Sequence, residues 1–295
     1  MNTLQQGQTV AMVKMIVSMA IFGSIGFFTQ ISGLPSIELV FVRCICATVF
    51  LAIIWGMTGQ AKKEQWQGRE VLLTLLCGFF LVFNWVFLFK AFEETTVTVA
   101  ISVYHLAPVF VLLIGAVIFK ERLTIKAVLA ILLCFSGTVF ISDVDFSKPF
   151  TELLPVGVLW ALAAALFYAF LTLIGKGLKS LSPYATTFLQ TGLGVVMLLP
   201  MVDFSAFQSL TFGNWIAIIA TGIIHTGIVY VLYFDSLRYL STAIISVLVF
   251  LDPAIAILLD VAFMDVRPNM MQSLGILLIF VGMALTFVKF KRSAA

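Results

Sequence analysis

Long apolar stretches follow one another along this chain, separated only by short charged or turn-forming segments. A helix needs about 20 mostly apolar residues to cross roughly 30 Å of hydrocarbon. Cutting the sequence at charge clusters and at Pro, Gly and Ser turns leaves ten such stretches: residues 11–30, 35–57, 70–91, 96–119, 122–142, 153–177, 183–201, 212–235, 239–264 and 268–290. The pattern predicts an all-α polytopic membrane protein with ten transmembrane helices.

Composition supports lipid as the solvent. Hydrophobic residues make up 62% of the 295 residues and charged residues only 11%, against about 25% charged in soluble domains. The first apolar stretch lacks the small-residue cleavage site of a secretory signal, so we interpret it as a retained helix. The connections are too short for a soluble domain, which excludes catalysis in a large extramembrane module. The small positive net charge gives no indication of nucleic-acid binding.

The distribution of basic residues predicts the orientation. With the connections assigned alternately from a cytoplasmic N-terminus, 13 of the 17 Lys and Arg residues fall on the cytoplasmic side. Three (Lys90, Lys148 and Arg267) fall on the other side, and Arg43 lies within a span. The positive-inside rule therefore predicts a multi-pass protein of the cell inner (plasma) membrane with both termini cytoplasmic.

The two halves of the chain share a weak internal repeat. A shift of 145 residues superposes Ala20 on Ala165 and Phe22 on Phe167, and likewise Pro108 on Pro253 and Gly137 on Gly282. Because each half holds an odd number of spans, the second copy must cross the membrane in the opposite direction. Inverted repeats of this kind are typical of secondary transporters. We expect a first five-helix repeat at 1–145 and a second, inverted one at 146–295.

Two segments of the first half carry a family resemblance. Residues 89–109, FKAFEETTVTVAISVYHLAPV, and the junction Phe119-Lys120-Glu121-Arg122-Leu123 resemble the EamA-type repeat of the drug/metabolite transporter superfamily. Ala20-Ile21-Phe22-Gly23-Ser24 is also similar, although that family usually has Trp before the Gly. The second copy fits at Leu251-Asp252-Pro253, but its junction has Asp265 where Glu is usual.

The resemblance extends over essentially the whole chain and implies a transporter. Proteins of this superfamily export or import amino acids, other metabolites and toxic compounds, so the resemblance alone leaves the substrate open. We expect alternating access that moves an amino acid or a similar small metabolite outward, linked to protons. An exporter of cationic or aromatic toxic compounds is the alternative, followed by a membrane-embedded scaffold or enzyme that transports nothing.

Polar side chains at bilayer depth are the default site candidates, because each costs several kcal/mol unless it faces a cavity or a partner. The sequence offers few of them. The expected substrate-binding residues are Asn84, Tyr104, His105, Trp160, Tyr168, His225 and Asp252.

His105 and Asp252 are the candidates for proton coupling. Each precedes a repeat-related proline, Pro108 or Pro253, and a proline within a helix tends to break it. Broken helices at the midplane are where many transporters bind their substrates. The alternative is that each side chain is a buried polar group satisfied by a neighbouring helix.

Other candidates also have two interpretations. Arg43 either binds a substrate carboxylate or bonds to helix ends, and Asn84 and His225 either line the pathway or join helices by hydrogen bonds. The strip of Trp160, Phe167 and Tyr168 either faces the cavity or packs against helices and lipid. Glu38 lies near the outer interface, where we expect no special role.

Signature motifs for catalysis or ATP use are lacking. The sequence contains no Walker-type loop, no HExxH or GxSxG motif, and no cluster of residues spaced for a metal. We therefore expect no enzyme activity, no cofactor and no metal. The expected partners are a small-molecule substrate, protons and lipid, with the chain acting as a monomer or homodimer. The four Cys residues lie in apolar stretches and are expected to be buried thiols.

Overall fold

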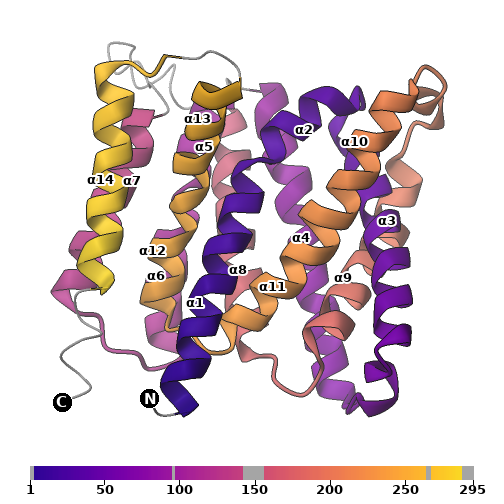
Figure 1. Cartoon of the computed structure of the whole chain (residues 1–295), viewed down its shortest axis with the longest axis horizontal. Helices are drawn as coiled ribbons and strands as arrows, with labels where there is room; N and C mark the ends of the chain where they lie inside the picture. The colour runs from indigo at the N-terminus through magenta and orange to yellow at the C-terminus, as the bar shows by residue number, and fades with distance from the viewer. Residues whose placement is uncertain (1–2, 95–96, 142–155, 264–266, 288–295) are drawn as a thin grey trace. The chain divides into compact units, whose positions relative to one another are not determined.

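The computed structural model describes residues 3–94, 97–141, 156–263 and 267–287, and these residues form helices and connections without a strand. The first half contains α1 (Thr3–Gly23), α2 (Ile25–Ser32), α3 (Ser36–Met57), the short η1 (Gln60–Lys63), α4 (Gly68–Glu94), α5 (Val97–Tyr104), α6 (Ala107–Ile118) and α7 (Ile125–Ile141). Figure 1 shows this order along the chain.

The second half has the same order of spans, with different interruptions. It contains α8 (Val156–Gly177), α9 (Pro183–Leu198), the short η2 (Leu199–Met201) and η3 (Phe204–Phe207), α10 (Phe212–Gly222), the π-helix η4 (Ile223–Ile228), α11 (Val229–Leu237), α12 (Thr242–Val249), α13 (Leu251–Phe263) and α14 (Met270–Phe287). Each predicted span corresponds to one of these helices or to consecutive helices, which confirms the all-α fold class.

Five of the described segments are long and apolar enough to cross a membrane by length and composition: Ser36–Met57, Gly68–Ala91, Val156–Gly177, Pro183–Met201 and Phe212–Leu237. Two of the other spans, α7 and α14, are single helices, and the rest are divided into shorter ones. The span with Pro108 is broken between α5 and α6, and the span with Pro253 is broken between α12 and α13. The expected interruptions before these prolines are therefore present, since proline removes a helical hydrogen bond and clashes with the preceding turn.

The chain divides into two compact units. Unit 1 comprises residues 1–86 and 170–239, and unit 2 comprises residues 87–169 and 240–295. Each unit combines helices from both halves, and the division falls inside α4 and α8. The expected boundary between the repeats, after residue 145, lies outside the described residues.

In unit 1, the equivalent helices α3 and α9 run antiparallel. Near the start of α3, Glu38 accepts a hydrogen bond from Asp203 N, beyond the end of α9, at 2.9 Å. Near its end, Trp55 Nε1 donates to Glu64 at 3.0 Å, and Glu64 also accepts from Ser182 N, the N-cap of α9, at 2.9 Å. Opposite directions of equivalent helices are what an inverted repeat requires. Glu38 is also buried, and its carboxylate joins α3 to the segment after α9.

In unit 2, the equivalent helices α7 and α14 form a tight reciprocal contact. A Cβ added to Gly137 would lie 2.5 Å from Gly275 O, and one added to Gly282 would lie 2.7 Å from Ala130 O. A shift of 145 residues carries Gly137 onto Gly282 and Ala130 onto Gly275. The two contacts are therefore equivalent by the internal repeat. Small residues allow such close approach of membrane helices.

A carboxylate joins the two repeat-related broken spans of unit 2, α5–α6 and α12–α13. Glu121, three residues after the end of α6, accepts from Thr242 N at 2.9 Å and from Thr242 Oγ1 at 2.6 Å. Thr242 is the first residue of α12, so the Glu121 carboxylate satisfies a free N–H group at a positive helix end. The Glu-Arg-Leu junction of the sequence thus acts as a cap for a helix of the other half.

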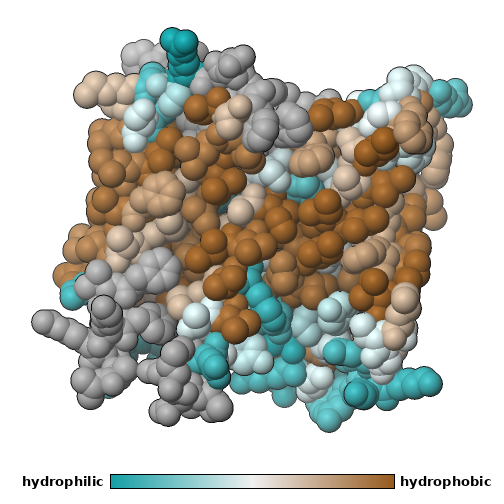
Figure 2. Space-filling view, viewed as in Figure 1, coloured by the Kyte–Doolittle hydropathy of each residue, from teal (hydrophilic) through white to brown (hydrophobic). Residues whose placement is uncertain are grey.

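The outer surface of each unit suits contact with lipid. In the view of Figure 2, hydrophobic side chains cover the middle of the helices and hydrophilic side chains gather toward their ends. Large apolar side chains such as Val196 in unit 1 and Val117 in unit 2 are exposed. Lipid chains can cover such residues at no cost, whereas water cannot.

Candidate functional site

Arg43, in the first half of α3, is the centre of a buried polar cluster in unit 1. Its side chain is only 3% exposed. Nε donates to Thr226 Oγ1 at 3.0 Å, and Nη2 donates to the backbone carbonyl of His225 at 3.3 Å. These bonds use two of the five guanidinium N–H groups. Within the described part of the chain, the other three have no hydrogen-bond partner, and Arg43 forms no ion pair.

The partners of Arg43 lie in η4, a single turn of π-helix between α10 and α11. Gly222, before η4, and Gly227, within it, allow α3 to approach closely, because a Cβ at Gly222 would clash with Cys46 Cβ and one at Gly227 would lie 3.0 Å from Phe50 Cδ1. Such π-turns are rare and occur frequently at functional sites. This turn directs the His225 carbonyl and the Thr226 hydroxyl toward the guanidinium group.

The ring of His225 is also buried, at 1% exposure. Its Nε2 lies 2.9 Å from Ser24 Oγ, and Ser24 Oγ lies 2.7 Å from the carbonyl of Ile21. A carbonyl only accepts, so Ser24 donates its single hydrogen to Ile21 and Nε2–H of His225 donates to Ser24. Nδ1 is then left as an acceptor, and it has no partner among the described residues.

Aromatic rings complete the cluster. The Cζ of Arg43 lies 5.5 Å from the ring centroid of Trp85 on α4, a distance suited to a cation–π interaction. Trp85 in turn lies 5.9 Å, centroid to centroid, from Tyr230 on α11, and Phe28 lies 5.0 Å from His225. The cation therefore lies beside aromatic rings in the buried interior of unit 1.

Asn84 and His225 are the two predicted site residues in unit 1. Asn84 precedes Trp85 on α4 and is 1% exposed. Both residues are therefore buried in unit 1, and their role stays a prediction. Sequence reasoning missed the contacts of Ser24 and Thr226. The signal for Thr226 was the polar pair His225-Thr226 between Gly222 and Gly227, and Ser24 stood out only as part of the family similarity at Ala20–Ser24.

Unit 2 contains the other five predicted residues, Tyr104, His105, Trp160, Tyr168 and Asp252. The ring of Tyr104 at the end of α5 lies 5.9 Å from that of Tyr168 on α8. Trp160, eight residues before Tyr168 on α8, packs against a small buried cluster of Ala91, Ala100 and Ala161. Part of the predicted aromatic strip therefore packs between helices, as its alternative interpretation stated.

His105 follows α5 at the break before Pro108. Its Nδ1 donates to the carbonyl of Ile101 at 2.8 Å, and its ring lies beside that of Phe250 with centroids 6.3 Å apart. Asp252 lies at the start of α13, just after the matching break, and is only partly buried. Its carboxylate has no hydrogen bond or ion pair to any described residue. His105 is thus partly satisfied by its own helix, whereas the Asp252 carboxylate has no described partner.

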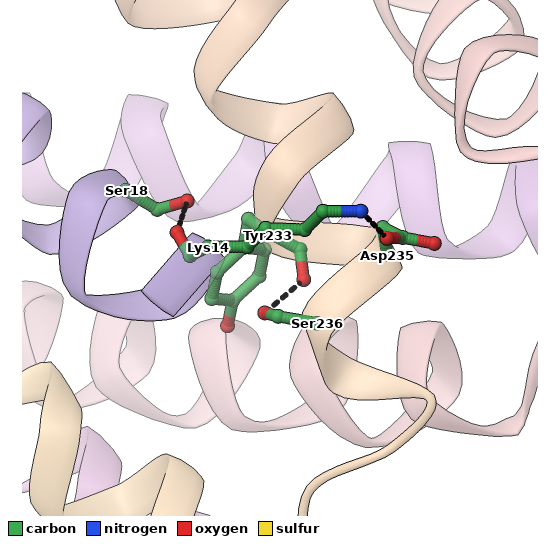
Figure 3. A network of polar contacts seen from close by, with 5 residues as sticks. All are labelled: Lys14, Ser18, Tyr233, Asp235 and Ser236. Carbon is green, nitrogen blue, oxygen red and sulfur yellow. Dashed lines mark hydrogen bonds and ion pairs between the residues drawn. The ribbon is translucent and has the colours of Figure 1, made fainter. Parts of the chain in front are cut away.

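An ion pair joins α1 to α11 in unit 1. Lys14 Nζ contacts Asp235 Oδ2, and both side chains are partly exposed. Figure 3 shows this pair beside two further bonds, from Ser18 Oγ to Lys14 O at 2.8 Å and from Ser236 Oγ to Tyr233 O at 2.7 Å. The same two spans also meet through Ser24, between α1 and α2, and His225 in η4. The first and eighth predicted spans are therefore joined by polar interactions at two separate positions along their length.

Comparisons with known proteins agree on one family. The sequence profile of the EamA-like transporter family matches residues 9–143 and again 155–288. A Bacillus subtilis (strain 168) protein named "Uncharacterized transporter YxxF" is 61% identical over 282 residues, 96% of this chain and 91% of that protein. An "Uncharacterized transporter" of Archaeoglobus fulgidus is 24% identical over 92% of this chain and 94% of its own.

A solved crystal structure has the same fold. It superposes with a TM-score of 0.82 over 97% of this chain and 99% of that chain, at 18% sequence identity. At that identity the likeness concerns the fold alone. The fold and the two profile matches together agree with the repeat inferred from the 145-residue shift.

Proposed function

This chain belongs to the EamA-like transporter family, and from that premise we propose that it is a secondary active transporter of small metabolites that carry a carboxylate, chiefly amino acids. The observation that carries the proposal is Arg43: a buried cation with three unused N–H groups and no acidic partner in the described residues. A buried charge without a counter-charge is strongly unfavourable. A substrate carboxylate supplies the missing charge.

The neighbours of Arg43 suit an amino acid. His225 Nδ1 is an acceptor without a described partner, and it accepts from an N–H donor such as an ammonium group. Trp85 and Tyr230 provide aromatic surface for an apolar side chain. An acceptor beside a cation, flanked by rings, matches a carboxylate and an amine on one carbon better than it matches a simple cation.

We further propose the orientation and location expected from the positive-inside rule. Contacts in unit 1 support a single basic end, because Glu70 accepts from the backbone N–H groups of Lys179 and Ser180 at 3.1 Å, and Arg238 donates to Leu181 O. Arg69, Lys179 and Arg238 therefore lie at the same end, which we assign to the cytoplasm. In this proposal the protein lies in the cell inner membrane with both termini cytoplasmic.

Outward transport and proton linkage are also proposals. Asp252 supports the second, since a carboxylate without a described partner inside a membrane helix suits reversible protonation. His105 is the other candidate. If proton-driven flux in liposomes is unchanged in both His105→Gln and Asp252→Asn, coupling does not run through these residues.

A counterflow assay in proteoliposomes tests the substrate. Vesicles preloaded with pooled amino acids should accumulate labelled amino acid, whereas vesicles preloaded with the matching decarboxylated amines should not. Arg43→Gln should abolish the exchange while the protein still folds. Exchange of quaternary amines but not amino acids would instead support an exporter of cationic or aromatic toxic compounds, which the rings of Trp85 and Tyr230 favour. No exchange of any pool would support a scaffold that transports nothing.

A further inference from the structure

A line of buried polar groups without partners lies along the contact between α4 and α9 in unit 1. Thr74 on α4 and Thr186 and Gln190 on α9 are each 0% exposed. Thr74 Oγ1, Thr186 Oγ1 and both amide atoms of Gln190 have no hydrogen-bond partner among the described residues. Buried polar atoms are almost always bonded, so four such atoms along one helix contact require an explanation.

The register of the two helices places these groups together. A Cβ on Gly78 would lie 3.0 Å from Gln190 Cα, and one on Gly194 would lie 3.4 Å from Val82 Cγ2. Both contacts join residues 112 apart, and Glu70 bonds to the N–H of Leu181, 111 residues on. The helices therefore run parallel in constant register. Thr74 is one turn before Gly78 and Thr186 one turn before Gln190, so Thr74 and Thr186 lie on facing sides at the same level.

The chemistry of these atoms selects the ligand. Hydroxyl and amide oxygens can bind a monovalent cation, but Gln190 Nε2 carries two N–H donors that a cation cannot satisfy. Water both donates and accepts, and buried waters typically make about three hydrogen bonds to otherwise unsatisfied groups. We propose that the α4–α9 contact holds internal water bound by Thr74, Thr186 and Gln190.

This water site begins one turn from Glu70, at the basic end of unit 1. It extends to Gln190 along the contact between α4 and α9, which we call the seam. It is separate from the Arg43 cluster and does not depend on which substrate the protein carries. It provides a path of exchangeable hydrogen bonds into the membrane-spanning part of unit 1. Two helices joined through water also retain partners for their polar groups when they separate.

A native cysteine reports on the seam. Cys77 is fully buried, donates to Leu171 O at 3.2 Å, and directly precedes Gly78, which packs against Gln190. Cys134 is a matched control: it is equally buried and donates to Ile279 O at 3.5 Å in the α7–α14 contact. The two thiols differ in that unpartnered polar atoms lie next to Cys77.

Hydroxyl radicals generated from water by an X-ray pulse oxidise side chains next to bound water. In the full-length protein in lipid nanodiscs, Cys77 should be oxidised clearly faster than Cys134. The double variant Thr74→Val, Gln190→Leu should reduce the oxidation of Cys77 to the level of Cys134. If Cys77 in the unaltered protein reacts no faster than Cys134, the seam is dry and the proposal fails.

Thermal unfolding provides a second test with a definite sign. In a dry seam, replacing Thr74 with the similarly shaped Val removes an unsatisfied hydroxyl and should raise Tm. With water bound, the same change deprives that water of a partner, and Tm should stay the same or fall. Thr138→Val is the control, because the Thr138 hydroxyl donates to Cys134 O and its loss should lower Tm. A higher Tm for Thr74→Val would overturn the proposal.

Discussion

Arg43 and Trp85 are in cation–π contact, with the guanidinium Cζ 5.5 Å from the centroid of the indole ring. The two residues come from α3 and α4, and Arg43 also bonds to η4. One cation thus joins three segments of unit 1. The planar guanidinium group can stack on a ring and donate to several acceptors at once, which the compact ammonium group of lysine cannot do.

Arg43→Lys should therefore impair transport although the charge is kept. Hydrogen bonds to charged groups contribute about 1.5–3 kcal/mol, so we expect roughly a tenfold or larger rise in the substrate concentration for half-maximal counterflow. Arg69→Lys, at an exposed position of α4, is the control and should behave like the unaltered protein. Equal transport by the two variants would contradict a role for the guanidinium geometry.

Gly137→Ala should destabilise the protein. The new Cβ would lie 2.5 Å from Gly275 O, and a backbone atom cannot move aside cheaply. Overpacking of this kind costs about 1–3 kcal/mol of the free energy of unfolding, measurable by denaturation in mixed micelles. Gly192→Ala has its nearest neighbour at 3.9 Å, so it should gain up to about 1 kcal/mol from helix propensity. The opposite order of stability would show that α7 and α14 are less closely packed.

Glu121→Ala should weaken the start of α12. The change leaves Thr242 N and Oγ1 without their carboxylate acceptor, and loss of a charged cap costs about 1–3 kcal/mol. Glu121→Gln keeps one acceptor oxygen and should lose less. Arg122→Ala, at the exposed neighbouring residue, serves as the reference. Denaturation midpoints that do not follow this order would count against the cap.

The Lys14–Asp235 ion pair should contribute a small coupling energy. Both side chains are partly exposed, and such pairs contribute about 0.2–1 kcal/mol. A double-mutant cycle with Lys14→Gln and Asp235→Asn should show this coupling in the free energy of unfolding, and high salt should reduce it. Strictly additive effects of the two changes would mean that the pair adds nothing to the α1–α11 contact.

Sequence reasoning predicted the helices well because the membrane imposes a length and a composition on each of them. The breaks before Pro108 and Pro253 were also accessible, since proline acts locally. The break at Ser24, between α1 and α2, carries no comparable signal. The π-turn at η4 was equally hidden, because one extra residue per turn leaves the apolar pattern of residues 212–235 almost unchanged.

The candidate site could be predicted only in part. Polar residues within apolar stretches identified Arg43, Asn84 and His225, but their partners depend on contacts between residues far apart in sequence. Arg43 lies 183 residues before Thr226, and Ser24 lies 201 residues before His225. No local pattern specifies such pairs. The unpartnered atoms of Thr74, Thr186 and Gln190 likewise became visible only once the register of α4 and α9 was known.

The reciprocal glycine contact between α7 and α14 has a consequence for how this chain can change over time. Each copy of the duplicated half supplies a surface to the other, so Gly137 in one copy faces the position equivalent to Ala130, and Gly282 faces Ala130 itself. A larger residue in one copy must be accommodated by a smaller one in the other. Substitutions elsewhere in the two halves can accumulate independently, but substitutions along the α7–α14 contact must compensate one another.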